Sequence, residues 1–304
     1  MKVTVLYGGP SAERDISLIS GQAVMDGLRQ AGHEVFGSDI APTDLRGLDH
    51  PCDVIFPALH GQFGESGELQ DFLERRGIPF VGSGSIASRL GMDKVQAKRA
   101  WDNQKLPTPA YELLTKGRPT RVKPPCVVKP VDSGSSIDVF ICRGEAEMED
   151  ACHRVLTKHG RALVEQYVKG TELTVAILEE RALSPIRITT HHDFFDYTAK
   201  YVGNDAQHHF DLRLPENVVN QVKEIAVRAH EALGCRDLSR IDFLVDEKHR
   251  PWLLELNSMP GFTPKSLLPE AAAHDGVPFA QLVDRLVCRA YKRSRMGEKK
   301  RDVA

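Results

Sequence analysis

The segments Arg240-Ile241-Asp242-Phe243 and Leu253-Leu254-Glu255-Leu256-Asn257 each have the length and apolar content of a β-strand. Side chains alternate between the two faces of a strand. Glu255 and Asn257 are therefore predicted to share one face of the second strand, and Leu254 and Leu256 to lie on the other. The sequence thus predicts a strand with one polar and one apolar face.

The same rule places Arg240 and Asp242 on one face of the first strand. A turn predicted at 246–250 makes the strands neighbours, so that Asp242, Glu255 and Asn257 converge. Two carboxylates and an amide oxygen are hard ligands suited to Mg²⁺. The planar, positively charged guanidinium of Arg240 beside such a site could bind a phosphoryl or carboxylate group through two hydrogen bonds. A solvated polar sheet face is the alternative interpretation.

A second signal directed at phosphate lies earlier in the chain. Lys129 ends the apolar strand Cys126-Val127-Val128-Lys129 and leads into the loop Ser133-Gly134-Ser135-Ser136. A lysine at a strand end, followed by a small loop with free amides and hydroxyls, can cover nucleotide phosphates. Ser and Gly are also ordinary loop residues. The sequence has no GxxxxGK[ST] and no GxGxxG after the first strand, which excludes a Walker P-loop and a dinucleotide fingerprint.

The first third of the chain alternates short apolar strands with helices. Val3 to Tyr7 and Asp53 to Phe56 are predicted strands, and Ser11 is a plausible N-cap for the helix after the first. This alternation predicts βαβ units and a parallel sheet. Glu13 and His60 follow strands, at the carboxyl ends where such sheets place ligands, although purely structural roles are commoner for each.

The length of 304 residues suggests about two domains. The middle third, however, predicts a compact α+β unit of its own, which gives three lobes. The predicted boundaries are 1–90 for the N-terminal α/β domain, 91–172 for the central lobe and 173–304 for the C-terminal lobe. The polar segment 191–214 has no clear period, and a long irregular segment is usually either disordered or an active-site lid.

Composition limits the partners. The chain has 40 Lys+Arg against 42 Asp+Glu, so no global field attracts a polyanion. No stretch of the sequence is long and apolar enough for a membrane-spanning helix, and the apolar run at its start is too short for a signal peptide. We therefore expect a soluble, cytoplasmic chain without nucleic-acid or membrane partners. The six cysteines form no CxxC pair and favour free thiols, and the basic tail from Lys292 is predicted to be a solvated end rather than a binding patch.

Taken in order, the motifs of the chain resemble the D-alanine:D-alanine ligase family of the ATP-grasp superfamily, from about Val3 to Tyr291. The matching segments are Tyr7-Gly8-Gly9-Pro10-Ser11-Ala12-Glu13-Arg14, Ala58-Leu59-His60-Gly61, Gly82-Ser83-Gly84, Met92-Asp93-Lys94, Val128-Lys129-Pro130, Gly134-Ser135-Ser136, Asp196-Tyr197-Thr198-Ala199-Lys200-Tyr201, Arg240-Ile241-Asp242 and Leu254 to Thr263 with Ser266-Leu267. The resemblance implies a three-lobed ATP-grasp fold, α/β and α+β, in which two sheets clamp ATP.

The resemblance also assigns the nucleotide and metal ligands. ATP phosphates would contact lysines 94 and 129, the 165–168 segment would bind adenine, and Glu172 would hold the ribose. The metal site would hold two Mg²⁺ ions, with Mn²⁺ as an alternative. The implied ATP ligands are Lys94, Lys129, Ser136, Glu165, Gln166, Tyr167, Val168, Glu172 and Lys200, and the implied metal ligands are Asp242, Glu255 and Asn257.

For the amino-acid substrates, the resemblance implies that Glu13, Ser135 and Tyr201 form a hydrogen-bonded set that closes the site. Glu13 would also orient the first D-alanine, with His60 nearby. The oxyanion would be stabilised by Arg240 and the Gly261 amide, and the second carboxylate would be held by Ser266 and the Leu267 amide.

The implied activity is ATP-dependent formation of D-alanyl-D-alanine for peptidoglycan and cell shape, by a cytoplasmic homodimer. Some positions depart from the family pattern, among them Thr198, Gln166, 137–138 and 207–213. Two alternatives stay open. The chain could join a different amino acid or hydroxy acid pair, or it could be a nucleotide-binding homologue with little turnover.

Overall fold

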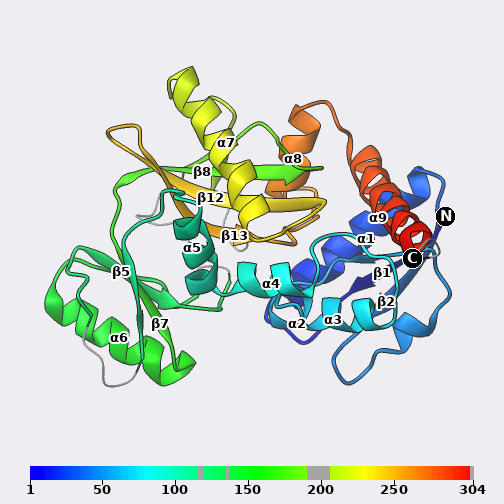
Figure 1. Cartoon of the computed structure of the whole chain (residues 1–304), viewed down its shortest axis with the longest axis horizontal. Helices are drawn as coiled ribbons and strands as arrows, with labels where there is room; N and C mark the ends of the chain where they lie inside the picture. Colours follow the sequence, from blue (N-terminus) through cyan, green and yellow to red (C-terminus); the bar gives the residue numbers. More distant parts are fainter. Residues whose placement is uncertain (116–119, 135–136, 190–205, 302–304) are drawn as a thin grey trace.

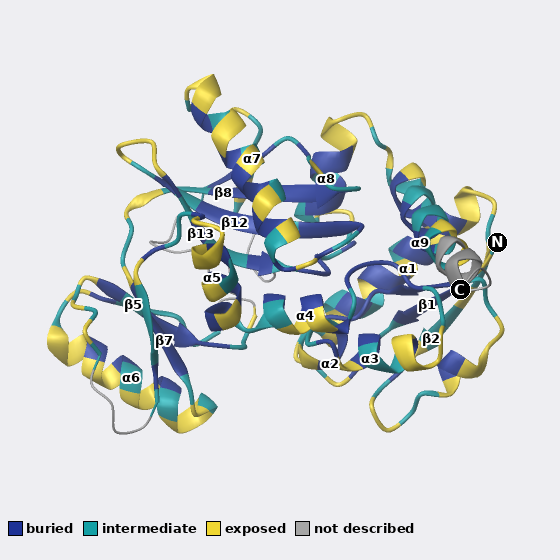
Figure 2. Ribbon diagram, viewed as in Figure 1, coloured by how far each residue is buried: buried dark blue, intermediate teal, exposed yellow. Residues whose placement is uncertain are grey.

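The computed structural model describes residues 1–115, 120–134, 137–189 and 206–301, with side chains described as far as Arg295. Within these residues the strands form three sheets, each in a different part of the chain (Figure 1). Figure 2 shows that the strands are mostly buried, whereas the helices expose their outer faces. Each sheet therefore forms the inner layer of its own unit.

The N-terminal sheet is parallel, with the order β2-β1-β3. β1 (Lys2–Tyr7) lies between β2 (Glu34–Asp39) and β3 (Val54–Pro57), and α1 (Arg14–Gln30) packs beside β1 and β2. The predicted parallel βαβ arrangement is confirmed. The shorter helices of this part of the chain are η1 (Arg46–Asp49), α2 (Gln62–Glu65), α3 (Glu68–Arg75) and α4 (Ser85–Met92).

The start of α1 differs from the prediction. The N-cap residue is Glu13, and its side chain makes no capping hydrogen bond. Ser11 lies in the preceding turn, where its Oγ accepts a hydrogen bond from the Glu13 amide at 3.2 Å and its carbonyl accepts one from the Arg14 amide at 3.1 Å. Ser11 as N-cap was therefore wrong, because its hydroxyl closes the turn before the helix. The consequence is that Glu13 stands at the helix start.

The central sheet is antiparallel, with the order β4-β7-β5-β6. One face is covered by α6 (Glu145–His159), which buries Met148, Ala151 and Val155. The chain enters this unit through α5 (Lys94–Asn103), whose N-cap Asp93 accepts hydrogen bonds from the two amides at 95 and 96, both at 3.0 Å. The strands are β4 (Tyr111–Leu114), β5 (Cys126–Pro130), β6 (Phe140–Cys142) and β7 (Ala162–Gln166).

The third sheet has the order β11-β10-β8-β12-β13, with β9 paired to β8. The long hairpin β12–β13 confirms that the two late strands are neighbours. The strands are β8 (Gly170–Leu178), β9 (Arg181–Ala182), β10 (Ile186–Thr189), β11 (Gln207–His209), β12 (Leu238–Asp246) and β13 (Pro251–Asn257).

The two faces of this sheet have different neighbours. α7 (Glu216–Ala232) covers one face, where Leu173, Val175 and Phe243 are buried against it. On the opposite face, α8 (Leu267–His274) packs against the far end of β8. The near end of that face carries Glu172, Thr174 and Asp242, by strand alternation. Polar groups thus gather on the part of the sheet that no helix of the described residues covers.

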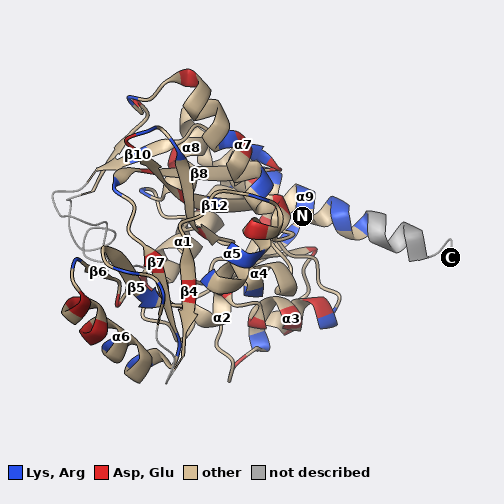
Figure 3. Ribbon diagram, turned by 60° about the vertical axis from the view of Figure 1, so that its left-hand side comes forward, with Lys and Arg blue, Asp and Glu red and all other residues tan. Residues whose placement is uncertain are grey.

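The last helix, α9 (Phe279–Arg301), returns to the N-terminal unit and packs against α1 and β3. Figure 3 shows this helix extending from the body of the molecule with basic residues along it. Arg293 donates to the buried carboxylate of Asp237 at 2.5 Å and to the carbonyl of Phe80 at 2.8 Å. A solvated end from Lys292 was therefore wrong at Arg293, because a buried carboxylate requires a cation.

Two expectations concern the chain as a whole. All six cysteines are free. Among the described residues, no helix has the length and apolar character needed to cross a membrane. The first two sheets fall within the predicted segments 1–90 and 91–172, whereas β8 of the third sheet begins at Gly170, before the predicted start of the third segment at 173. In addition, α4 spans the first boundary and α9 packs on the N-terminal unit. The boundaries themselves stay a prediction.

Candidate functional site

A cavity of about 540 Å³ lies between the central and C-terminal sheets. Its size is typical of a site for a small ligand or cofactor. The central sheet and the loops beside it contribute Lys129 and Ser133, and the C-terminal sheet contributes Thr171, Asp242 and Glu255. The nucleotide residues expected from the sequence that line this cavity are Lys94, Lys129, Glu165, Gln166, Tyr167, Val168 and Glu172. We call it the nucleotide cavity.

A buried charge cluster supports one wall of the nucleotide cavity. Glu165 lies between Lys129, at 2.5 Å, and Lys98, at 2.9 Å, and Lys98 is fully buried. Burial alone would raise the pKa of Glu165, but the two lysine charges outweigh it and hold that pKa below its usual value. Lys98 also donates to the hydroxyl of Thr108 at 2.5 Å, and that hydroxyl donates to the carbonyl of Leu253 at 2.9 Å. Lys98 thus links the central sheet to β13.

Lys98 was missed in the sequence analysis. Its signal was its spacing of four residues from Lys94, which places both lysines on one face of α5. Both are buried in the structure.

The two late strands bring the expected metal ligands together. Asp242 is paired directly with Glu255, and Arg240 with Asn257. Asp242 accepts hydrogen bonds from the Thr174 hydroxyl at 2.6 Å and from both Nε and Nη2 of Arg240, at 3.0 and 2.8 Å. The predicted convergence is confirmed.

Leu254 breaks the predicted alternation of this strand. The register shifts after Asp242, so that Phe243 pairs with Leu253 and Leu254 is the extra residue of a β-bulge. Leu254 lines the nucleotide cavity beside Glu255, while Leu253 is buried in the core. The expectation that Leu254 faces away from Glu255 was wrong, because a bulge places two residues opposite one.

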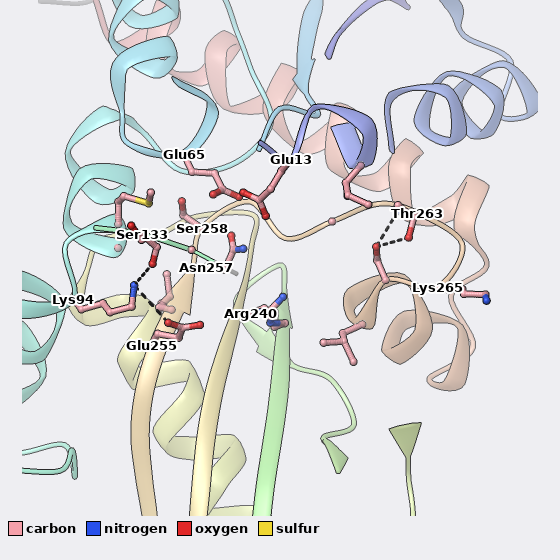
Figure 4. A pocket seen from close by; sticks show the side chains of 18 of the residues that line it. Glu13, Glu65, Lys94, Ser133, Arg240, Glu255, Asn257, Ser258, Thr263 and Lys265 are labelled. Carbon is pink, nitrogen blue, oxygen red and sulfur yellow. Dashed lines mark hydrogen bonds and ion pairs between the residues drawn. The ribbon is translucent and has the colours of Figure 1, made fainter. Parts of the chain in front are cut away.

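A second pocket lies at the end of the β12–β13 hairpin, beside the start of α8 (Figure 4). Glu13 and Glu65 reach it from the N-terminal unit, and Arg240 and Asn257 reach it from the hairpin. It shares Lys94, Ser133 and Glu255 with the nucleotide cavity. We call it the amino-acid pocket, after the substrates that the sequence resemblance leads us to expect there. The sequence-predicted residues that line it are Glu13, Lys94, Arg240, Glu255, Asn257, Gly261, Ser266 and Leu267.

Lys94 joins the two cavities. Its Nζ lies 2.6 Å from the carbonyl of Ser133 and 3.6 Å from Glu255 (Figure 4). A cation in this position can attract the phosphate of one ligand and the carboxylate of the other.

His60 lies behind the pocket wall. It is buried, with Nε2 3.3 Å from the Ser20 hydroxyl and Nδ1 3.5 Å from Glu65. Glu65 is therefore the group that faces the amino-acid pocket, and sequence reasoning missed it. The signal that could have indicated Glu65 was its place among the glycines 61, 64 and 67 that follow β3.

The start of α8 forms another wall of the amino-acid pocket. Ser266 is the N-cap, and its Oγ accepts a hydrogen bond from the Thr263 amide at 3.0 Å. A Cβ at Gly261 would lie 2.7 Å from that same Oγ, so any larger residue would crowd it. Free amides at a helix start suit a carboxylate. Four expected site residues, Ser135, Ser136, Lys200 and Tyr201, lie outside the described residues.

Models of the D-ala D-ala ligase C-terminus and N-terminus match residues 100–288 and 39–83. The chain belongs to this family. It is 41% identical over 296 residues to a D-alanine–D-alanine ligase of Anaeromyxobacter sp. (strain Fw109-5), covering 94% of this chain and 96% of the relative. It is 40% identical over 300 residues to a D-alanine–D-alanine ligase of Gloeobacter violaceus, covering 95% of this chain and 99% of the relative.

The architecture is shared with solved ligases. The structure of a D-alanine–D-alanine ligase from Bacillus anthracis complexed with ATP has a TM-score of 0.86 and 29% identity, covering 98% of this chain and 99% of the other. A ligase from Coxiella burnetii, with a TM-score of 0.87 and 24% identity over 100% of this chain and 97% of the other, has the same fold. The expected ATP-grasp fold is confirmed.

Proposed function

We propose that this chain joins two D-alanine molecules into D-alanyl-D-alanine, with ATP converted to ADP and phosphate. One observation carries the proposal, beside the family match. The nucleotide cavity and the amino-acid pocket meet at Lys94, Ser133 and Glu255. A phosphoryl group at that junction can pass from a nucleotide on one side to a carboxylate on the other.

The chemistry needs such a junction because a free carboxylate is a poor acyl donor. Transfer of the terminal phosphoryl group of ATP to the first D-alanine makes an acyl phosphate, with phosphate as the later leaving group. Lys94 and Lys129 would neutralise charge on the transferred group, so catalysis consists of positioning and electrostatics. The side chain of Glu13 would orient the first D-alanine.

The proposal of a magnesium site rests on the kinds of ligand atoms that the hairpin provides. Asp242 is paired directly with Glu255, and Asn257 lies two residues further along the strand of Glu255. Asp242 lines the nucleotide cavity, Asn257 lines the amino-acid pocket and Glu255 lines both. Among the described residues no cluster of three His, Cys, Asp or Glu side chains is arranged for a metal, and the third donor proposed here is an amide oxygen. These residues would hold two Mg²⁺ ions, or Mn²⁺, which would neutralise phosphate charge. Arg240 and Lys94 balance the same carboxylates in the structure.

In the second step the amine of another D-alanine attacks the acyl carbon. Arg240 and the backbone amide of Gly261 would stabilise the oxyanion that forms there. Ser266 and the Leu267 amide would hold the second carboxylate at the start of α8. The proposed partners of Glu13 in closing the site, Ser135 and Tyr201, lie outside the described residues.

The family match also supports a proposal for the biological setting. We propose a cytoplasmic homodimer that supplies peptidoglycan precursors for the cell wall and cell shape, with D-alanine and ATP as small-molecule partners and neither nucleic acid nor membrane bound. The altered segment 207–213 motivates the second candidate, an ATP-grasp ligase for a different amino acid or hydroxy acid pair. A homologue with little turnover is less well supported, because the described phosphate, metal and oxyanion positions carry the expected residue types.

A coupled ADP-release assay with D-alanine tests the proposal. We expect ADP formation that requires D-alanine, and a Glu255→Gln variant that loses more than the roughly 10–100-fold typical of an outer-shell partner of a metal site. Glu247→Gln is the matched control, since Glu247 lies in the turn of the same hairpin, is exposed and pairs with Lys169 at 3.0 Å. No turnover with any D-amino acid would overturn the proposed function, and full activity of Glu255→Gln would overturn the metal assignment.

A further inference from the structure

The wall of the amino-acid pocket beside α8 carries a hydrogen-bonded His–Glu pair that the proposed chemistry does not use. His208, in β11, lines the pocket, and its Nδ1 lies 2.5 Å from Oε2 of Glu270. Both side chains are partly exposed, at 21% and 32%. A carboxylate can only accept, so the imidazole donates from Nδ1. Nε2 is then the ring nitrogen that a ligand in the pocket can meet.

The fold places this pair beside the proposed anchor of the second substrate. Glu270 lies three residues after Leu267 in α8, so both face the same side of the helix. On β10, Ile188 is paired with His208, and it also packs against Leu267. His208 is therefore held over the first turn of α8, where the second carboxylate is proposed to bind.

The polarity of the pocket wall at this place influences which side chain is favoured on the second substrate. A methyl group gains most from an apolar wall, whereas a hydroxyl can donate to or accept from an imidazole nitrogen. Glu270 fixes the ring by its Nδ1 hydrogen bond, so the orientation of Nε2 is set before the substrate arrives. Preorganised hydrogen bonding of this kind favours a ligand that can use it.

We propose that His208, positioned by Glu270, is a specificity-determining residue that admits a small D-amino acid with a hydrogen-bonding side chain as second substrate, in competition with D-alanine. D-Serine is the smallest such amino acid. This inference rests on the proposed function, because it assumes that the second carboxylate binds at Ser266 and Leu267.

The test is a competition in one reaction. Equal concentrations of D-alanine and D-serine are supplied with ATP, and mass spectrometry measures the ratio of D-alanyl-D-serine to D-alanyl-D-alanine, with fragment ions separating D-seryl-D-alanine. We expect both products from the unmodified chain, and a ratio about 10-fold lower for His208→Leu, from loss of about one hydrogen bond. Because the ratio is internal, it does not depend on the amount of folded enzyme.

The chain offers a matched control in the next residue. His209 lies on the same strand with its side chain on the other face, where Nε2 is 2.9 Å from the Thr189 hydroxyl. His209→Leu should keep the ratio of the unmodified chain. Glu270→Leu, which frees the ring, should lower the ratio by less than His208→Leu does.

The outcomes separate the two proposals. If the unmodified chain makes D-alanyl-D-alanine but no D-alanyl-D-serine, or if His208→Leu leaves the ratio unchanged, the inference is wrong and the ligase activity stands. If the unmodified chain makes no dipeptide from D-amino acids, the proposed function fails instead. Should His208→Leu fail to fold, His208→Phe, which keeps a ring of similar size, gives the same ratio measurement.

Discussion

The nucleotide cavity and the amino-acid pocket contain the same kinds of charged groups but hold them differently. At the nucleotide cavity, Glu165 is only 3% exposed and lies between two lysine side chains. At the amino-acid pocket, the side chains of Glu255 and Glu270 are 28% and 32% exposed; Lys94 lies 3.6 Å from Glu255, and His208 lies 2.5 Å from Glu270. The first arrangement is a permanent part of the fold, whereas the second can exchange partners when a ligand binds.

Burial explains the difference. A carboxylate removed from water must keep its cations, since an uncompensated buried charge costs several kcal/mol. A carboxylate that still contacts water loses little when its partner moves. Residues of the nucleotide cavity should therefore affect stability and binding together, and residues of the amino-acid pocket should affect activity with little change in stability.

The largest effect is expected at Glu165. In Glu165→Gln two buried ammonium groups, those of Lys98 and Lys129, remain without their shared carboxylate. We expect a loss of about 3–5 kcal/mol in the free energy of unfolding, measured by urea denaturation. Glu255→Gln serves as the comparison and should lose about 1 kcal/mol or less. Similar losses in the two variants would remove the distinction between the cavities.

A change at Arg240 tests the expectation that residues of the amino-acid pocket affect activity. It lines the amino-acid pocket but not the nucleotide cavity. Arg240→Met should lower kcat by roughly 10²–10³-fold, as the loss of an oxyanion donor does. Nucleotide affinity, measured by titration calorimetry in the absence of D-alanine, should stay close to that of the unmodified chain.

A control from the same hairpin guards against a purely structural effect of that change. Arg250 lies just before β13, is exposed and pairs with Asp246 at 2.8 Å. Arg250→Met should keep full turnover. A loss of nucleotide affinity in Arg240→Met equal to its loss of kcat would mean that Arg240 acts on the nucleotide side.

The sequence predicted the β12–β13 hairpin well, because strand alternation and turn signals are properties of neighbouring residues. Strand alternation and a short turn suffice to bring Asp242 and Glu255 together, and the register confirms it. The bulge at Leu254 could not be predicted in this way, because an extra residue leaves the apolar pattern of the strand almost unchanged. The parallel order of the first sheet likewise followed from alternating strands and helices.

The missed residues depend on contacts between distant segments. Lys98 resembles a solvent-facing lysine of an amphipathic helix until β7 brings Glu165 against it. Arg293 resembles part of a solvated tail until the turn before β12 places Asp237 beneath it. In both cases the partner lies more than fifty residues away, so no local pattern reveals that the cation is required.

One buried ionisable residue, His230, lies behind the amino-acid pocket rather than at the nucleotide cavity, and it tests whether burial has the same effect there. His230, on α7, is fully buried, and its Nδ1 lies 2.7 Å from the hydroxyl of Ser239, the neighbour of Arg240 on β12. Burial is the main cause that lowers the pKa of His230 from 6.5 to about 4. The native state therefore keeps this ring neutral between those values, while the unfolded chain binds a proton. Stability from His230 is present above pH 6.5 and is lost as the pH falls toward 4.

His230→Gln should remove that dependence. The unmodified chain should lose roughly 1.4 kcal/mol more than the variant between pH 7.5 and pH 5.5, measured as the free energy of unfolding by urea at each pH. His153→Gln, at an exposed position on α6, should keep the pH slope of the unmodified chain. Equal slopes for the unmodified chain and His230→Gln would show that this histidine has the same pKa in the native and the unfolded state, and so takes up its proton while folded. The sheet behind Arg240 would then tolerate a buried charge, and burial alone would not separate the two cavities.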